Sequence, residues 1–232
     1  MLGGLGSNSA RSAKKIVPTL WVWGLNSSGR LGLGNTIPRS KPVAIDNGMA
    51  WASVSAGGGH TMAIKSTGSL WAWGYNGETT DYGIIGGQLG LGDITARSSP
   101  VQVGTDTNWS SVSTGGAHTM AIRTTGSLWA WGFNSRGQLG LGDFTARSSP
   151  VQVGTDTNWA SASVGYSHTL ARKTDGSLWS WGLRTSGQSG VPIIQSTSSP
   201  VQVQTATNWK RQSSAVNHNA AVKIFTTQNP TT

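Results

Sequence analysis

Pairs of tryptophans recur through the chain and divide it into repeats. The pairs stand in four similar segments, TLWVWG, SLWAWG, SLWAWG and SLWSWG, at intervals of 50, 58 and 50 residues. The paired residues are Trp21, Trp23, Trp71, Trp73, Trp129, Trp131, Trp179 and Trp181. Other landmarks keep step with them: Pro42, Pro100, Pro150 and Pro200, then Trp51, Trp109, Trp159 and Trp209, then His60, His118, His168 and His218. Such a period indicates tandem units that stack on one another.

Each repeat predicts a β-hairpin followed by further short strands. In HTLARKTDGSLWSWG, alternating stretches flank Asp175-Gly176, a dipeptide that favours a two-residue hairpin turn. Side chains alternate along a strand, so Trp179 and Trp181 share one face while Ser180 lies on the other. Each indole buries roughly 150–250 Å² when packed, which a lone small sheet cannot provide. We therefore expect the large tryptophan face of one unit to pack against the small face of the next, as in a β-propeller.

The composition agrees with an all-β chain. Charged residues make up only 11% of the 232 residues, whereas 33 are glycine, which suits short strands joined by tight turns. The absence of cysteine excludes disulfides and thiolate metal sites. No apolar run approaches the length of a membrane span, and residues 1–18 lack the apolar stretch of a signal peptide, so we expect a soluble product with a basic arm at 1–18 and a tail at 226–232.

The repeat resembles that of the regulator of chromosome condensation family. LWAWGFNSRGQLGLGD, followed by SSPVQV and NWASASVG, carries the resemblance, which covers residues 19–225. It implies a propeller of about fifty residues per blade; the best-known members close a ring with seven repeats, and this chain has four. We predict an all-β propeller of about four blades, closed by pairing the strand around Trp21 and Trp23 with residues 221–225. Pairing between different molecules, giving a closed oligomer or a filament, is the alternative.

Several recurring polar residues have a structural and a functional interpretation. The four histidines could converge on a metal, but we favour a bond from a ring nitrogen to a neighbouring backbone group. LGLGD resembles a phosphate-binding loop only in its glycines, since neither a lysine nor a helix follows, and it predicts a turn. The acidic residues at recurring positions could bind calcium, but their spacing favours turn capping; they are Asp93, Asp106, Asp143 and Asp156. We predict no metal and no cofactor.

Two features are candidate partner contacts. An eight-residue insertion interrupts the second repeat and carries Glu78, Asp81, Tyr82, Ile84 and Ile85. A glycine-flanked loop that breaks a repeat is a favourable place for a specific contact, although it could equally be a tolerated surface insertion. Arg97 and Arg147 stand in identical TARSSPVQV settings and could recognise carboxylate or phosphate, with solvated loop arginines as the alternative.

The function predicted from these residues is non-catalytic. The eight acidic residues are scattered among turns, no serine stands in a nucleophile elbow, and the histidines have no fixed acid partner. The net charge of +9 comes from dispersed residues, so nucleic acid is an unlikely partner. The tryptophan-, serine- and threonine-rich texture resembles repeats of bacteriophage virion proteins, which implies a capsid decoration or tail-associated adhesin that binds other virion proteins or a host surface. The alternatives are a chromatin- or GTPase-binding module and a carbohydrate-binding propeller.

Overall fold

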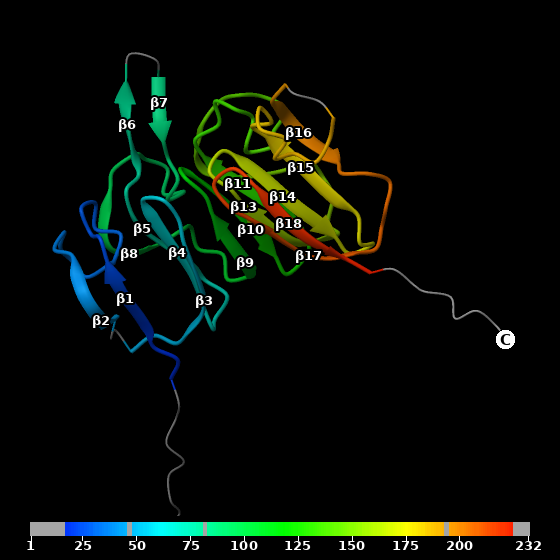
Figure 1. Ribbon diagram of the computed structural model, residues 1–232. Coiled ribbons are helices and arrows are strands. Elements are labelled where there is room, and N and C mark those ends of the chain that lie inside the picture. Colours follow the sequence, from blue (N-terminus) through cyan, green and yellow to red (C-terminus); the bar gives the residue numbers. More distant parts are fainter. Residues whose placement is uncertain (1–16, 46–47, 81–82, 193–194, 225–232) are drawn as a thin grey trace, which may run out of the picture.

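Three four-stranded antiparallel sheets form the body of the molecule, and we call each a blade (Figure 1). The computed structural model describes residues 17–45, 48–80, 83–192 and 195–224, where every regular element is a strand. The first blade contains β3 (Trp51–Ala56), β4 (His60–Lys65), β5 (Leu70–Gly74) and β8 (Arg97–Gln102). The second contains β9 (Trp109–Thr114), β10 (His118–Arg123), β11 (Leu128–Gly132) and β12 (Arg147–Gln152). The third contains β13 (Trp159–Val164), β14 (His168–Lys173), β15 (Leu178–Gly182) and β16 (Thr197–Gln202).

The predicted hairpin forms the middle of every blade. In the third blade β14 pairs with β15 so that His168 lies opposite Gly182, and the same register recurs in the other two blades. The connecting turn differs from the prediction. The N–H of Gly176 donates to the carbonyl of Lys173 (3.0 Å), and Gly176, unlike Asp175, has a positive φ of 83°. The loop therefore has three residues and ends on a left-handed glycine, instead of the expected two-residue turn.

The blades pack as the alternation of large and small residues predicts. Trp181 of the third blade is fully buried against the second blade, where it joins Met120, Leu128 and Ala130 in one apolar cluster. Trp131 makes the equivalent contacts with the first blade. The first strands of consecutive blades contact each other directly, so they form the narrow side of each wedge. The core of the molecule thus lies between the blades.

Half-blades of two strands flank the three complete blades. At the N-terminal side β1 (Leu20–Gly24) pairs with β2 (Arg39–Ile45). At the C-terminal side β17 (Trp209–Ser214) pairs with β18 (Asn219–Lys223). In sequence position, the N-terminal pair corresponds to the third and fourth strands of a blade, and the C-terminal pair corresponds to the first and second.

The predicted closure of the ring within one chain does not occur. Within the described residues β1 pairs only with β2 and β18 only with β17, and the two half-blades lie at opposite ends of the row of blades (Figure 1). As a consequence Trp21 and Trp23, which we expected to be packed between sheets, are 55% and 60% exposed.

The insertion in the second repeat forms a hairpin of its own. Strands β6 (Gly77–Thr80) and β7 (Gly83–Gly86) pair with Glu78 opposite Ile85, and the hairpin projects from the body of the molecule (Figure 1). It is therefore more regular than the loop that the sequence suggested. Asp81 and Tyr82 lie outside the described residues. Across the described ranges, no helix has the length and apolar character needed to cross a membrane.

Candidate interaction surfaces

The histidines hold neighbouring blades together. Between the first and second blades, the Nε2–H of His60 donates to the hydroxyl of Thr119 (2.9 Å), which in turn donates to the carbonyl of Gln88 (2.9 Å). The indole N–H of Trp131 donates to the same carbonyl (2.9 Å). The threonine hydroxyl uses its own hydrogen on the carbonyl, so the histidine must carry its proton on Nε2.

The same network recurs between the second and third blades. His118 donates to Thr169 (3.2 Å), and Thr169 and Trp181 both donate to the carbonyl of Gln138 (2.9 Å each). The prediction of a backbone partner is wrong for three histidines, because His60 and His118 bond to a threonine hydroxyl of the following unit and His168 bonds to the side-chain oxygen of Asn219. The sequence signal was present, because a threonine follows the histidine in three of the four units.

Burial keeps these imidazoles neutral. It lowers the pKa of both His60 and His118 to about 3, and nearby His60 and His168 contribute to lowering the pKa of His118. Burial also lowers the pKa of His168. Within the described part of the chain, no group of three or more histidine, aspartate or glutamate residues could hold a metal ion.

In each of the three complete blades, the outer tryptophan of the pair carries a cation on its ring. The Nζ of Lys65 lies 3.2 Å from the ring centroid of Trp71, and the Cζ of Arg123 lies 4.0 Å from that of Trp129. Arg123 also pairs with Asp106 at 2.6 Å. These rings are half-buried and already covered by charge, which disfavours a sugar-stacking platform. Lys65 and Arg123 are therefore engaged within the fold.

The two candidate arginines lie within their own turns. Arg97 pairs with Asp93 and Arg147 pairs with Asp143, each at 2.6 Å. The N–H of Thr145 donates to Asp143 (2.9 Å) and the amide of Asn134 donates to it (3.2 Å). Although burial alone would raise it, the backbone bond and Arg147 hold the pKa of Asp143 below its usual value. A role for these arginines in binding a partner stays a prediction.

The turn-capping prediction divides the four aspartates into two kinds. Asp93 and Asp143 accept bonds from the N–H groups of Thr95 and Thr145 two residues later, so the prediction is confirmed for both. The other two, Asp106 and Asp156, instead pair with basic side chains of a neighbouring strand. For them the sequence offered no signal, because their partners lie 17 residues away.

An apolar groove runs across the turns between the first and second strands of each unit, and we call it the inner groove. Its volume is about 210 Å³. It is lined mainly by small residues together with Tyr166 and Val216, which are 60% and 61% exposed. A side chain at Gly115 would collide with the carbonyl of Gly165, so the turns approach this closely only because they contain glycine. The sequence analysis did not identify this surface, although a glycine stands three residues before three of the four histidines.

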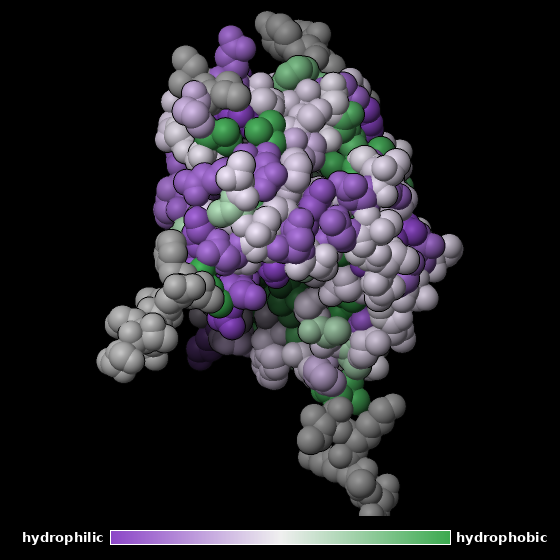
Figure 2. All heavy atoms as spheres, turned by 90° about the vertical axis from the view of Figure 1, so that its right-hand side faces the viewer, coloured by the Kyte–Doolittle hydropathy of each residue, from purple (hydrophilic) through white to green (hydrophobic). Residues whose placement is uncertain are grey.

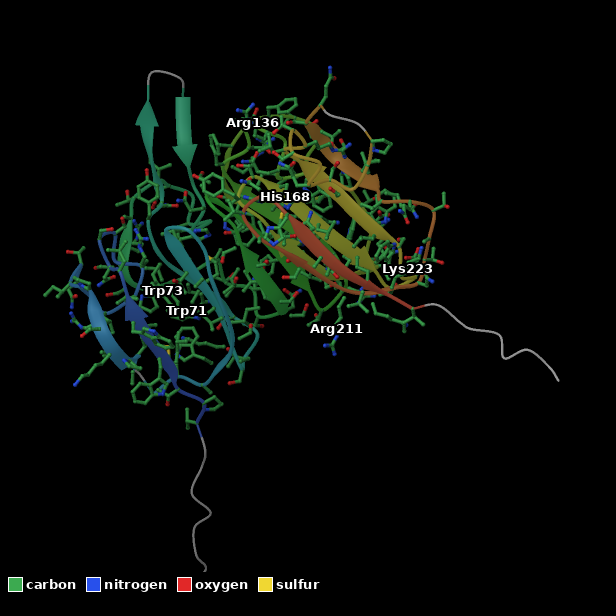
Figure 3. All side chains as sticks on the ribbon, viewed as in Figure 1. Trp71, Trp73, Arg136, His168, Arg211 and Lys223 are labelled. Atoms are coloured by element: carbon green, nitrogen blue, oxygen red, sulfur yellow. The ribbon has the colours of Figure 1, made fainter. Side chains whose placement is uncertain are left out.

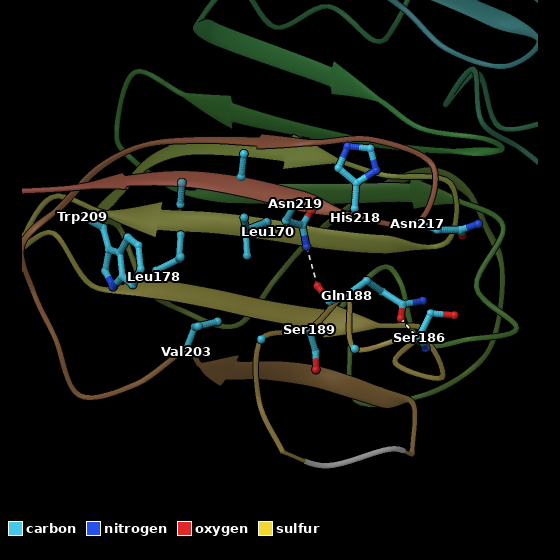
Figure 4. A pocket seen from close by; sticks show the side chains of 14 residues that line it. Leu170, Leu178, Ser186, Gln188, Ser189, Val203, Trp209, Asn217, His218 and Asn219 are labelled. Atoms are coloured by element: carbon cyan, nitrogen blue, oxygen red, sulfur yellow. Dashed lines mark hydrogen bonds between the residues drawn. The ribbon is translucent and has the colours of Figure 1, made fainter.

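A pocket of about 370 Å³ opens beside β18 (Figure 4). Leu170, Leu178, Val203 and Trp209 form its apolar wall. Asn219 crosses it to donate to the carbonyl of Gln188, as the dashed line in Figure 4 shows. We call it the end pocket. Figure 3 places His168 among the packed strands near it, and Arg211 at the border of the molecule.

The remaining surface is mixed. On the face shown in Figure 2, hydrophilic and near-neutral side chains predominate, and hydrophobic ones lie in small separate groups. Of the candidate contacts of the insertion, Glu78, Ile84 and Ile85 belong to the strands of the projecting hairpin. Neither Arg97 nor Arg147 is part of that hairpin, since both open the fourth strand of a blade.

Curated relatives share this repeat over part of their length. RCC1 domain-containing protein RUG3, mitochondrial, of Arabidopsis thaliana is 30% identical over 133 residues, which cover 56% of this chain and 28% of the relative. Ultraviolet-B receptor UVR8 of the same plant is 36% identical over 117 residues, covering 48% of this chain and 24% of the receptor. The chain thus matches about a quarter of the length of these relatives.

Solved structures show the same fold over about half of their length. Human WBSCR16 has a TM-score of 0.76 at 22% identity, covering 88% of this chain and 53% of that one. Prp20p from Saccharomyces cerevisiae, whose binding to Gsp1p and histones has been described, has a TM-score of 0.75 at 18% identity, covering 90% and 52%. The three blades and two half-blades therefore correspond to about half of such a propeller.

A family model settles the classification. The model of the Regulator of chromosome condensation (RCC1) repeat matches residues 19–64, 67–122 and 125–172, which is more than half of the chain. A second model of the same repeat matches 51–79, 109–138 and 159–188. The matched segments contain the tryptophan pairs and the histidines that build the inter-blade networks. The chain belongs to the RCC1 repeat family.

Proposed function

We propose that this chain is a non-catalytic platform that binds other proteins of a larger assembly. The observation that carries the proposal is the use of its polar residues. Three histidines bond across blades, the outer tryptophans of the complete blades lie under cations, and the two candidate arginines close turns. No constellation of acid, base and nucleophile is left over in the described residues, so recognition by surface shape is the function that the geometry supports.

The inner groove is the surface that we assign to the partner protein. It is apolar, it crosses the narrow ends of successive blades, and it exposes an aromatic ring, Tyr166, of the kind that dominates binding energy at protein interfaces. The projecting hairpin β6–β7 is a second contact on the same platform. Its residues Glu78, Ile84 and Ile85 keep the role that the sequence suggested.

The proposal also names the kind of assembly, a bacteriophage virion. Repeats rich in tryptophan, serine and threonine, with Glu78 as the one glutamate, support a virion component located in a capsid or tail. The test is co-sedimentation of the tagged chain with intact phage particles, with Tyr166→Ser as the groove variant and Phe144→Ser, at a similarly exposed ring outside the groove, as its control. Retention of the parent and the control but not of Tyr166→Ser is expected. Equal retention of all three would remove the groove from the proposal.

A second candidate follows from the solved relatives. The binding of Prp20p to Gsp1p and histones suggests a small GTPase or a basic chromatin protein as the partner. Accelerated nucleotide release from a Ran-type GTPase on addition of this chain would favour that candidate over the virion. Binding to DNA that disappears steeply with salt would reveal phosphate contacts instead of a protein interface.

A further inference from the structure

The end pocket lies where every complete interface holds a tryptophan. Trp131 and Trp181 fill the spaces between the three blades, and each donates its indole N–H to a carbonyl 43 residues earlier in the chain. At the next interface the equivalent carbonyl belongs to Gln188. It receives the amide of Asn219, which stands at the position of Thr169, but no indole from the described residues. Four apolar residues of the pocket wall stand at the positions of four residues that surround Trp181.

The correspondence is close along the apolar wall. Leu170 stands at the position of Met120, and Leu178 at that of Leu128. Val203 and Trp209 match Val153 and Trp159 in the same way. The pocket is therefore an indole socket that lacks its indole.

The N-terminal half-blade carries the missing part. In sequence position β1 matches β5, β11 and β15, so Trp23 corresponds to the buried Trp73, Trp131 and Trp181. Those three side chains are 0% exposed, whereas Trp23 is 60% exposed. Likewise, among the described strands only β17 pairs with β18, and a sheet edge that faces no strand is a template for another one.

We infer that the indole of Trp23 from a second copy of this chain fills the end pocket, while strand β1 of that copy pairs with β18. The two copies join head to tail, and a composite blade of β17, β18, β1 and β2 forms at the junction. Pairing within one chain is prevented because the two half-blades lie at opposite ends of the molecule (Figure 1). Because each chain corresponds to about half of the related propellers, two copies joined at both junctions close a ring.

The register of the composite blade follows from the complete blades. His60, which opens β4, pairs with Gly74, which closes β5. The same rule places His218 opposite Gly24, and consequently Ala220 opposite Val22. Trp23 then lies opposite Asn219, the residue that already reaches the carbonyl of Gln188.

The junction also completes the N-terminal interface. Thr61 donates to the carbonyl of Arg30 (2.8 Å), and Trp73 donates to the same carbonyl (2.9 Å), as in the other interfaces. The histidine that bonds to the threonine elsewhere comes from the preceding blade. In the composite blade that histidine is His218 of the second copy.

One residue of the junction is larger than its counterparts. Ala215 occupies the position of Gly57, Gly115 and Gly165, where a Cβ would collide with a carbonyl of the next unit. In the chain itself no blade follows Ala215 among the described residues, so its methyl group meets no such carbonyl. Across the junction it would face Gly57 of the second copy, and Ala215→Gly is therefore expected to tighten the association.

The first experiment measures mass and affinity. Sedimentation of the 232-residue chain over a range of concentrations is expected to show a dimer that dissociates on dilution. Trp23→Ala should weaken self-association about 100-fold, because buried tryptophans are the usual hot spots. Phe144→Ala, which removes a ring of similar exposure away from the junction, should leave it unchanged, and Ala215→Gly should strengthen it several-fold. Trp23 is exposed in the single chain, so its removal leaves the fold intact, which circular dichroism checks.

The second experiment tests the register. The natural chain has no cysteine, so Val22→Cys and Ala220→Cys can be introduced into separate chains and mixed under mild oxidation. A disulfide between the two chains is expected. Val22→Cys mixed with Val222→Cys, displaced by two residues, is the control and should not cross-link, because diagonal neighbours are too far apart. A monomer at all concentrations, an association insensitive to Trp23→Ala, or equal cross-linking of both mixtures would each overturn the inference.

Discussion

Two interfaces of the third blade differ in the residues at equivalent positions. One is its interface with the second blade, and the other is its interface with β17–β18. At the first, Leu139 and Ala130 lie in a continuous apolar cluster around Trp181. At the second, Ser189 and Ser180 occupy the equivalent positions, and the buried cluster shrinks to three residues. The difference shows that the inter-blade tryptophan is what makes an apolar core. Where it is missing, small polar residues and a pocket take the place of that core.

The largest effect is expected from removing that tryptophan at a complete interface. Trp131 is fully buried and bonded to the carbonyl of Gln88, so Trp131→Ala leaves a cavity and removes one of the two hydrogen bonds to that carbonyl. We expect a loss of about 3–5 kcal/mol in the free energy of unfolding, measured by urea denaturation.

The matched variant is Trp23→Ala, at the equivalent position of the N-terminal half-blade. In dilute solution, where the chain is a single molecule, this variant should lower the free energy of unfolding by no more than about 0.5 kcal/mol, because the side chain is exposed. Similar losses for the two variants would show that exposure does not distinguish the interfaces.

The second prediction uses acid to weaken the complete interfaces selectively. His60 and His118 have a pKa of about 3 in the folded chain and 6.5 in the unfolded chain. The unfolded state therefore binds more protons between these values. Stability is full above pH 6.5 and falls as the pH drops towards 3, by about 2 kcal/mol for each histidine at pH 5.

The check is a series of urea titrations from pH 7.5 to pH 5. His60→Gln keeps a hydrogen-bond donor but does not titrate, so it should unfold more easily at pH 7.5 and lose less stability on acidification than the parent. If the free energy of unfolding of His60→Gln fell with pH as steeply as that of the parent, His60 would not be a source of the acid sensitivity.

The third prediction concerns the close approach of the turns. Gly115 lies against the turn of the next blade, and Gly115→Ala would force the carbonyl of Gly165 to move. The expected cost is about 1–3 kcal/mol, measured as a decrease in the free energy of unfolding. The natural Ala215 marks the contrast at the C-terminal interface. Ala215→Gly should change the stability of the single chain by less than about 1 kcal/mol.

The sequence predicts the contacts that repeat and misses those that depend on global geometry. The alternation of Trp179 and Trp181 with Ser180 was enough to predict which face of each blade packs on the next, because side-chain direction along a strand is local. The partner of His60 was not predictable in this way, since Thr119 lies 59 residues away. The prediction that the ring closes within one chain was wrong. Closure depends on the angle between blades, which no single repeat specifies.

The candidate interaction surfaces also divide into local features that the sequence predicts and features that depend on how the units stack. The sequence singled out Arg97 and Arg147 as residues that could recognise carboxylate or phosphate. The aspartates that pair with them stand four residues earlier and could have been recognised as partners. The inner groove, in contrast, arises where glycine turns from three different units meet. A surface of this kind becomes visible only once the units are stacked.

The smallest effect is expected from changing the ion pair in the turn that precedes the fourth strand of a blade. Arg147 pairs with Asp143 at 2.6 Å, but their side chains are 27% and 40% exposed, so solvent screens the pair. Arg147→Ala should therefore cost less than about 1 kcal/mol in the free energy of unfolding. Asp143→Ala should cost more, because Asp143 also accepts the N–H of Thr145 and the amide of Asn134. If the arginine variant proved the more destabilising of the two, the ion pair, and not the capped turn, would be what holds β12 in its place.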